Sequence, residues 1–363
     1  MPIRDRPTDA CPGALRVHAA ADGGVARIRV PGGRLTATQF RAVRAAAPDG
    51  TVELTSRANL QIRGLAEGCA PGERLAAAGL LPSATHELVR NIIASPLSGD
   101  SELVRELDAG LCARPALAGL PGRFLFIVDS GDGDVAWLDG DVTALFRTSD
   151  TAAVLLGGVD VGLRAGRAEL VRTMLDCAER FLAVRTGEWR IAELPDLTGF
   201  RAMSGRVEPV PAGAPPARGP VGRFDRGDGL VSLGVSVPLG RVDPAQGAAL
   251  EAAGPELVIT PWRGVVVPDV PADRVDAVAA RLAATGLLLD PDAPAVTACT
   301  GRPGCAKALA DVRADAAAML RAGPGTTVAV HWSGCARRCG RPRGDVLDVV
   351  ATGDGYVVRR ELR

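Results

Sequence analysis

The sequence predicts an α+β protein that contains two copies of one β-α-β-β-α unit. Residues 30–36 match residues 237–243, which lie 207 positions further along the chain. A capping box opens a helix in each copy, formed by Thr36 with Gln39 and by Asp243 with Gln246. A pair of short apolar strands follows each helix. Two copies are too few for a solenoid, so a duplication that folds into one pseudo-twofold domain is the better account.

The elements of the first copy follow from apolar alternation and from turn residues. We expect a strand over 25–35 that ends at a Pro-Gly-Gly turn, a helix to about 47, strands at 52–55 and 60–62, and a helix near 72–79. The second copy repeats the strand pair at 257–260 and 265–267. Each copy therefore supplies a small sheet covered by two helices.

A further segment follows each copy. After the first we expect a helix at 101–111, strands at 124–129, 135–138 and 152–156, and a helix at 166–184. Residues 206–222 are rich in Pro and Gly and are typical of a linker. After the second copy we expect a helix at 305–321, a strand at 327–331 and a hairpin of 346–352 with 356–359.

Composition excludes several classes of partner. The chain has 42 basic and 42 acidic residues, so no overall field favours nucleic acid or an anionic membrane. We find no signal peptide, no apolar run of about 20 residues, and no P-loop or dinucleotide fingerprint. We expect a cytoplasmic protein, and clustered cysteines in a reducing compartment bind metal more often than they form disulfides.

Four of the eight cysteines form two spaced pairs, Cys299 with Cys305 and Cys335 with Cys339. Structural zinc sites usually have two to four residues between paired ligands, which the first pair exceeds. Glycines around both pairs let the backbone approach inorganic sulfide closely. The spacing favours an iron–sulfur cluster over zinc, and zinc in a binding or scaffold protein stays an alternative.

The two copies differ in their chemical groups. When the two copies are aligned at an offset of 207, Ile92 and Ser98 occupy the positions of Cys299 and Cys305. The thiols therefore belong to the second copy alone. At the same offset the first copy carries arginines that the second lacks, namely Arg27, Arg29 and Arg90. Arginine binds carboxylates through two parallel hydrogen bonds. We therefore expect an interdomain site with a metal centre on one side and anion-binding groups on the other.

These motifs resemble the sulfite/nitrite reductase family, which carries siroheme beside a [4Fe-4S] cluster. The resemblance rests on the cysteine pairs and on residues 10–16, 27–33, 54–61 and 90–99, and it is strongest toward the branch that contains the precorrin-3B synthases of aerobic cobalamin biosynthesis. It implies ferredoxin-like half-units, each followed by an α/β cofactor-binding segment. The implied parts are a first half-unit at 14–82, a tetrapyrrole-side domain at 83–205, a linker at 206–222, a second half-unit at 223–289 and a cluster domain at 290–363.

The resemblance also assigns residues. It implies that Cys299, Cys305, Cys335 and Cys339 ligate the cluster, with Cys339 next to a haem iron in the siroheme enzymes. It places Arg27, Arg90 and Arg123 over the reacting anion, and Arg57, Asn59 and Gln61 on the hairpin that holds the macrocycle. Arg29 and Arg63 complete the basic surface. One position departs from the reductases, because Leu125 stands where they carry a second basic residue.

Two enzymatic functions follow from this resemblance. The first is a precorrin-3B synthase-like monooxygenase that converts precorrin-3A with dioxygen and reductant, for which an apolar Leu125 suits a macrocycle edge. The alternative is a siroheme-dependent sulfite or nitrite reductase. The sequence leaves open whether the tetrapyrrole is substrate or siroheme, and whether a mononuclear non-haem iron is present. Either function needs an external electron donor, a nicotinamide-dependent reductase or a ferredoxin.

Overall fold

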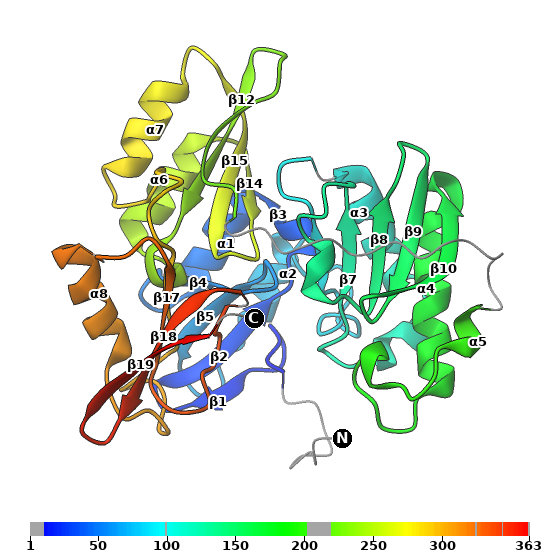
Figure 1. The fold of residues 1–363 in the computed structure, drawn as a ribbon, viewed down its shortest axis with the longest axis horizontal. Coiled ribbons are helices and arrows are strands. Elements are labelled where there is room, and N and C mark those ends of the chain that lie inside the picture. Colours follow the sequence, from blue (N-terminus) through cyan, green and yellow to red (C-terminus); the bar gives the residue numbers. More distant parts are fainter. Residues whose placement is uncertain (1–10, 99, 202–218, 324, 343, 362–363) are drawn as a thin grey trace.

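Two five-stranded sheets form the centre of the protein (Figure 1). The structure is a computed structural model and describes residues 11–98, 100–201, 219–323, 325–342 and 344–361. In sheet order, the first sheet contains β1 (His18–Ala20), β2 (Gly23–Ile28), β5 (Leu60–Leu65), β4 (Val52–Leu54) and β13 (Arg241–Val242). The second contains β11 (Gly222–Asp225), β12 (Leu230–Ser236), β15 (Gly264–Pro271), β14 (Glu256–Ile259) and β3 (Arg34–Thr36).

The two half-units exchange one strand each. β3 of the first copy pairs antiparallel with β14 of the second, and β13 of the second pairs antiparallel with β4 of the first. Apolar side chains of both copies consequently belong to one continuous core. The covering helices are α1 (Ala37–Ala46), α2 (Gly72–Ala77), α6 (Pro244–Ala253) and α7 (Val275–Ala283). Both capping boxes are present, as predicted.

The Pro-Gly-Gly segment interrupts the strand predicted over 25–35. It forms the 3-10 turn η1 (Pro31–Gly33), which separates β2 from β3. Gly33 has a φ of 70°, and a Cβ there would lie 2.1 Å from the carbonyl oxygen of Ile259. Only glycine fits this crossing, which directs β3 into the sheet of the other half-unit.

The first α/β domain holds a sheet in the order β10-β9-β8-β7-β6. Its strands are β6 (Ile92–Ala94), β7 (Phe126–Asp129), β8 (Val142–Phe146), β9 (Thr151–Leu156) and β10 (Val159–Gly166). Its helical segments are α3 (Ser101–Cys112), η2 (Pro115–Gly119), η3 (Ala136–Leu138), α4 (Arg167–Val184), η4 (Ile191–Glu193) and α5 (Thr198–Arg201). The strand predicted at 135–138 is wrong, because the Asp129 carboxylate accepts four backbone amides from 131–136 and bends this segment. The strands β8 and β10 were not predicted from the sequence.

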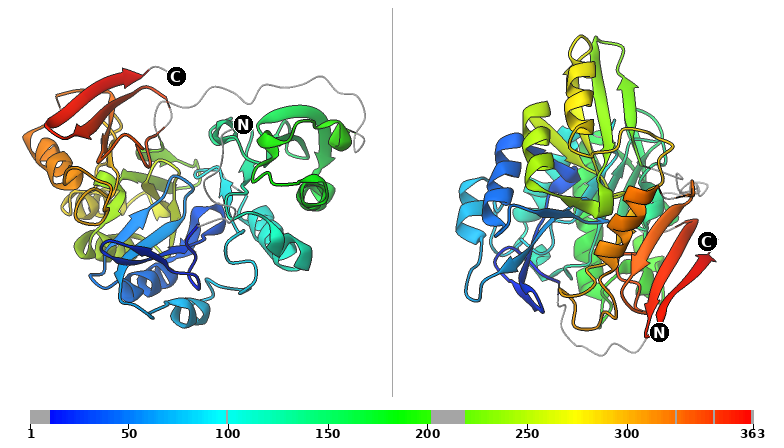
Figure 2. Two further views of the ribbon diagram at one scale, coloured as in Figure 1. Left: turned by 90° about the horizontal axis from the view of Figure 1, so that it is seen from below. Right: turned by 90° about the vertical axis from the view of Figure 1, so that its left-hand side faces the viewer.

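The second α/β domain is a four-stranded sheet in the order β16-β17-β18-β19. Its elements are β16 (Val296–Ala298), α8 (Val312–Ala322), β17 (Ala329–Ser333), β18 (Val346–Thr352) and β19 (Gly355–Glu361). The helix predicted to begin at 305 begins only at Val312, where Asp311 caps it by accepting the amide of Ala314. Figure 2 shows this sheet in orange and red, with the first α/β domain in cyan and green at the other end.

Two expectations concern the parts of the chain between and across these domains. Most of the predicted linker, 206–218, lies outside the described residues, and Gly222 already belongs to β11. Within the described ranges, none of the helices combines the length and the apolar character that crossing a membrane requires.

Candidate functional site

The four predicted cluster cysteines follow two neighbouring parallel strands. Cys299 comes directly after β16, and its amide donates to the carbonyl of Trp332 in β17. Cys305 lies in the turn after Cys299, whereas Cys335 and Cys339 follow the end of β17. β16 and β17 pair in parallel, so both cysteine segments leave the same edge of the sheet.

Small residues shape the loop around these thiols. The amide of Gly334 donates to the Sγ of Cys299 over 3.1 Å. A Cβ at Gly334 would lie 2.8 Å from the Cβ of Ala308 and 3.5 Å from that sulfur. The amide of Leu309 in turn donates to the carbonyl of Gly334 over 2.8 Å, joining the two cysteine loops. Backbone therefore approaches sulfur directly at this edge, as an iron–sulfur centre requires.

The thiols share one electrostatic environment. Partial burial raises the pKa of the Cys339 thiol, Arg337 opposes this, and the other three cysteines raise it further. Among the described residues, no group of three or more His, Cys, Asp or Glu side chains is arranged to hold a metal ion. The donor set and the amide directed at Cys299 fit the four-thiolate cluster that the resemblance implies, and the ligand assignment stays a prediction.

Two buried polar groups hold the second cysteine loop. His331 is fully buried, and its Nδ1 lies 2.8 Å from the Oγ1 of Thr297. Burial and the cations of Arg263 and Arg341 lower its pKa to about 3, so the imidazole is neutral at physiological pH. Arg338 forms an ion pair of 3.1 Å with the buried Asp348 of β18. Thr297 thus connects His331 to β16, and Arg338 connects the second cysteine loop to β18.

The first α/β domain carries an oxygen counterpart of the cysteine edge. Ile92 pairs with Phe126, and Val296 pairs with Val330, 34 residues on in both copies. The amide of Ser95 donates to Val128 as that of Cys299 donates to Trp332, and the amide of Ser130 donates to the Oγ of Ser95 over 3.0 Å. Ser95 therefore corresponds to Cys299. The predicted correspondences of Ile92 and Ser98 with the cysteines are wrong, because the offset here is 204.

Three predicted arginines gather on one side of the first half-unit. Arg29 is 2% exposed, and its Nη1 donates to the carbonyl of Pro12 over 3.3 Å. Its Nε and Nη2 have no hydrogen-bond partner within the described part of the chain. Burial and the neighbouring Arg27 lower its pKa to about 9. Burial and Arg190 lower the pKa of Arg57 to about 10. The three arginines thus form a cationic group in which Arg29 retains two buried donors without an acceptor among the described residues.

The remaining predicted site residues have other partners. Arg90 forms a bidentate ion pair with Asp108 and donates to the carbonyl of Leu80. Arg123 stacks on Trp189, with 5.1 Å from its guanidinium carbon to the ring centroid.

Asn59 and Arg63 support the scaffold around the site. The buried Asn59 accepts from the amide of Val30 and donates to Asn91. Arg63 binds Asp22 through two nitrogens and donates to the carbonyl of Gly304 over 3.1 Å. Arg63 therefore holds the first cysteine loop.

An interdomain cavity of about 600 Å³ is lined by Arg57, but by none of the four cysteines and none of the other predicted arginines. Residues from both α/β domains line it, including Ile93 and Leu125 of the first and their counterparts Thr297 and Ala329 of the second. Four arginines border it, namely Arg57, Arg190, Arg263 and Arg341. The volume is in the usual range of small-molecule sites.

One wall of the cavity is apolar. Leu125 is buried with Ile93, and Trp262 packs against this group. The rings of Trp137 and Trp262 lie 6.2 Å apart at the same wall. Leu125, the leucine at a position where the reductases carry a basic residue, therefore belongs to a continuous apolar surface. Sequence reasoning missed Trp262, Arg190 and Arg263, since only the fold brings them to the cavity, although Arg263 stands 207 positions after Ser56 of the predicted hairpin.

Comparison with known proteins agrees with this architecture. The model of the "Nitrite/Sulfite reductase ferredoxin-like half domain" matches residues 18–72 and 224–285, once in each copy. The NirA protein of Mycobacterium tuberculosis superposes with a TM-score of 0.71 at 21% sequence identity, over 93% of this chain and 73% of its own. The predicted fold class is confirmed, because the chain contains this half-domain twice and shares its overall fold with NirA.

Two curated relatives sharpen this position. The chain is 28% identical to a precorrin-3B synthase of Sinorhizobium sp, over 96% of this chain and 81% of the relative. It is 26% identical to the chloroplastic ferredoxin–nitrite reductase of Zea mays, over 87% of this chain and 67% of the relative. The predicted resemblance is therefore confirmed, and the precorrin-3B synthase is matched over a larger share of both chains.

Proposed function

We propose that the protein is a precorrin-3B synthase-like monooxygenase of aerobic cobalamin biosynthesis. It would convert precorrin-3A to precorrin-3B with dioxygen and reductant. The similarity to a precorrin-3B synthase over nearly the whole chain supports this function over the alternative. The conclusion rests above all on one observation, the interdomain cavity that combines an apolar wall with a border of arginines.

The chemistry of the cavity suits a tetrapyrrole with many carboxylates. Its apolar wall, formed by Leu125, Leu138, Trp137 and Trp262, packs against the flat face or edge of a macrocycle. Arg57 and Arg263 extend from equivalent hairpins of the two copies, so they bind carboxylates on opposite sides of the ring. Such contacts orient the substrate, and orientation is the main contribution of a protein to metal-based chemistry.

The chain's own residues divide the remaining roles. Cys299, Cys305, Cys335 and Cys339 would hold a [4Fe-4S] cluster, which supplies single electrons received from a ferredoxin or a nicotinamide-dependent reductase. Arg27 and Arg29 would bind the anionic groups nearest the reacting atoms, because both belong to the group of neighbouring arginines on the first half-unit. Arg90 stabilises the scaffold through its ion pair with Asp108. Arg123 would contact the ligand only at the outer edge of the binding site.

The test is direct. Protein purified anaerobically and reconstituted with iron and sulfide is given precorrin-3A, dioxygen and a chemical reductant, and the product is analysed by mass spectrometry. We expect a hydroxylated lactone, formed only when dioxygen is present. A preparation with intact cluster that leaves precorrin-3A unchanged would refute the proposal.

The alternative is a siroheme-dependent sulfite or nitrite reductase. The clustering of Arg27, Arg29 and Arg57 favours it, because small oxyanions need several converging cations. A purified protein with siroheme absorbance that reduces nitrite or sulfite with methyl viologen would establish this function. Leu125 argues against it, since one cation of the reductase pattern is missing.

A further inference from the structure

Four polar residues form a row across the first central sheet. Arg27 of β2 stands opposite Gln61 of β5, Gln61 stands opposite Glu53 of β4, and Glu53 stands opposite Arg241 of β13. Neighbouring residues in a row of this kind lie on the same face of the sheet. The row therefore crosses four strands and ends at the exchanged strand from the second copy.

Hydrogen bonds connect the row. The Nη2 of Arg27 donates to the Oε1 of Gln61 over 2.8 Å, and the Nε2 of Gln61 donates to the Oε2 of Glu53 over 2.8 Å. This is the amide orientation that satisfies both neighbours, because a guanidinium needs an acceptor and a carboxylate needs a donor. Glu53 thus fixes which end of the Gln61 amide faces Arg27.

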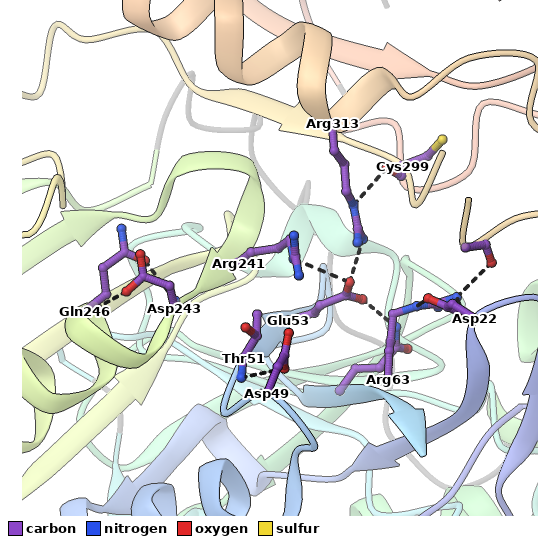
Figure 3. A network of polar contacts seen from close by, with 12 residues as sticks. Asp22, Asp49, Thr51, Glu53, Arg63, Arg241, Asp243, Gln246, Cys299 and Arg313 are labelled. Atoms are coloured by element: carbon purple, nitrogen blue, oxygen red, sulfur yellow. Dashed lines mark hydrogen bonds and ion pairs between the residues drawn. The ribbon is translucent and has the colours of Figure 1, made fainter. Parts of the chain in front are cut away.

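The second oxygen of Glu53 faces the cysteine loop. The Nη2 of Arg313, from α8, donates to the Oε1 of Glu53 over 2.5 Å, and its Nε donates to the carbonyl of Cys299 over 3.3 Å. Figure 3 shows Glu53 below Arg313, with Arg241 to its left, whose Nε lies 3.9 Å from the same Oε1. One carboxylate therefore contacts Gln61 of the row directly and, through Arg313, the backbone carbonyl of the predicted cluster ligand Cys299.

We propose that Glu53 is a positioning residue that couples the cluster-bearing loop to Arg27. Its two oxygens serve two different donors, so a glutamine, with a single oxygen, cannot satisfy both. If the glutamine at position 53 keeps its oxygen toward Arg313, Gln61 must turn its NH2 group toward Arg27, which places donor against donor. If it keeps its oxygen toward Gln61, Arg313 loses its acceptor beside Cys299. The loss of the negative charge also leaves the cation of Arg313 uncompensated near the cluster.

The coupling predicts two linked changes in Glu53→Gln. The reduction potential of the cluster shifts to more positive values, because added positive charge stabilises the reduced form. The affinity for a polycarboxylate tetrapyrrole falls roughly tenfold, as expected for the loss of one oriented, charge-assisted hydrogen bond. Iron and sulfide content stays that of the parent, since none of the four cysteines changes.

The matched control is Glu251→Gln. Glu251 of α6 is also a partly buried carboxylate bound by two arginines, Arg41 and Arg44 of α1. It lies outside the row, so its variant removes the same charge from the same kind of ion pair. We expect its potential and its affinity to equal those of the parent.

The inference rests on the proposed function for the cluster, for the binding role of Arg27 and for the identity of the ligand. The experiment therefore measures iron and sulfide content, the midpoint potential by redox titration, and the dissociation constant for uroporphyrin by fluorescence quenching. Turnover of precorrin-3A is assayed separately, so an inactive parent refutes the proposed function and leaves the other readouts to decide the coupling. Equal values for Glu53→Gln and Glu251→Gln, or a change in only one of the two readouts, would overturn the role of Glu53.

Discussion

The closeness of backbone and sulfur at Gly334 leads to a sharp prediction for Gly334→Ala. The added Cβ would lie 2.8 Å from the Cβ of Ala308, about 1 Å inside ordinary carbon–carbon contact. Gly334 does not have the left-handed backbone that disfavours alanine, so the cost arises from the contact alone. To relieve it, either the amide moves away from the Sγ of Cys299 or the bond from Leu309 to Gly334 breaks.

Overpacking of this kind costs about 1–3 kcal/mol, so the variant unfolds at lower denaturant concentration and retains less iron and sulfide after desalting. The double variant Gly334→Ala with Ala308→Gly removes the colliding methyl group and should recover most of both losses. Gly353→Ala, at the turn between β18 and β19, is the control because a Cβ there meets no atom within 4 Å. A double variant as impaired as Gly334→Ala itself would contradict the steric explanation.

Three further predictions concern buried charges. Burial raises the pKa of Asp134 to about 6 from 3.8. The folded state therefore binds this proton more tightly than the unfolded state, and the free energy of unfolding falls as pH rises through this range. Asp134→Asn should raise the melting temperature at pH 8 and change it little at pH 4. Arg90→Ala leaves Asp108 without its ion pair and should lower the free energy of unfolding in urea by about 3–5 kcal/mol. The control Arg223→Ala loses the exposed pair with Asp276 and should lower it by at most about 1 kcal/mol. Arg29→Met should raise stability by about 1–3 kcal/mol, because two buried donors lack partners, and should weaken uroporphyrin binding measured by fluorescence.

Local patterns were sufficient to predict the repeated units. Both capping boxes and both strand pairs lie where the sequence places them, because each depends on residues close together in the chain. These features need no knowledge of long-range packing. The convergence of the four cysteines stays a prediction, and that both pairs lie at one edge follows from the pairing of β16 with β17, 34 residues apart.

Long-range features were not predictable in this way. The exchange of β3 and β13 between the sheets depends on the crossing at Gly33, whose closest atom belongs to Ile259 of the other copy. The arginines also could not be sorted from sequence. Arg27 and Arg90 look alike in the sequence, yet Arg90 meets Asp108 across 18 positions, whereas Arg27 meets Gln61. The partners of each arginine therefore depend on residues that only the fold brings close.

The corrected register shows that the duplicated fold presents oxygen at one edge and sulfur at the equivalent edge. The same backbone turn presents Ser95 in one copy and Cys299 in the other, and in both an amide points at the side-chain atom, oxygen or sulfur. In the first copy the hydroxyl of Ser95 donates to Asp134 over 2.6 Å, so protein groups satisfy the turn without a ligand. In the second copy the glycines and thiols leave the corresponding donors directed at sulfur, which suits a cluster. The scaffold therefore supplies the same edge twice, and the four thiols of the proposed cluster, Cys299, Cys305, Cys335 and Cys339, occur at only one of the two edges.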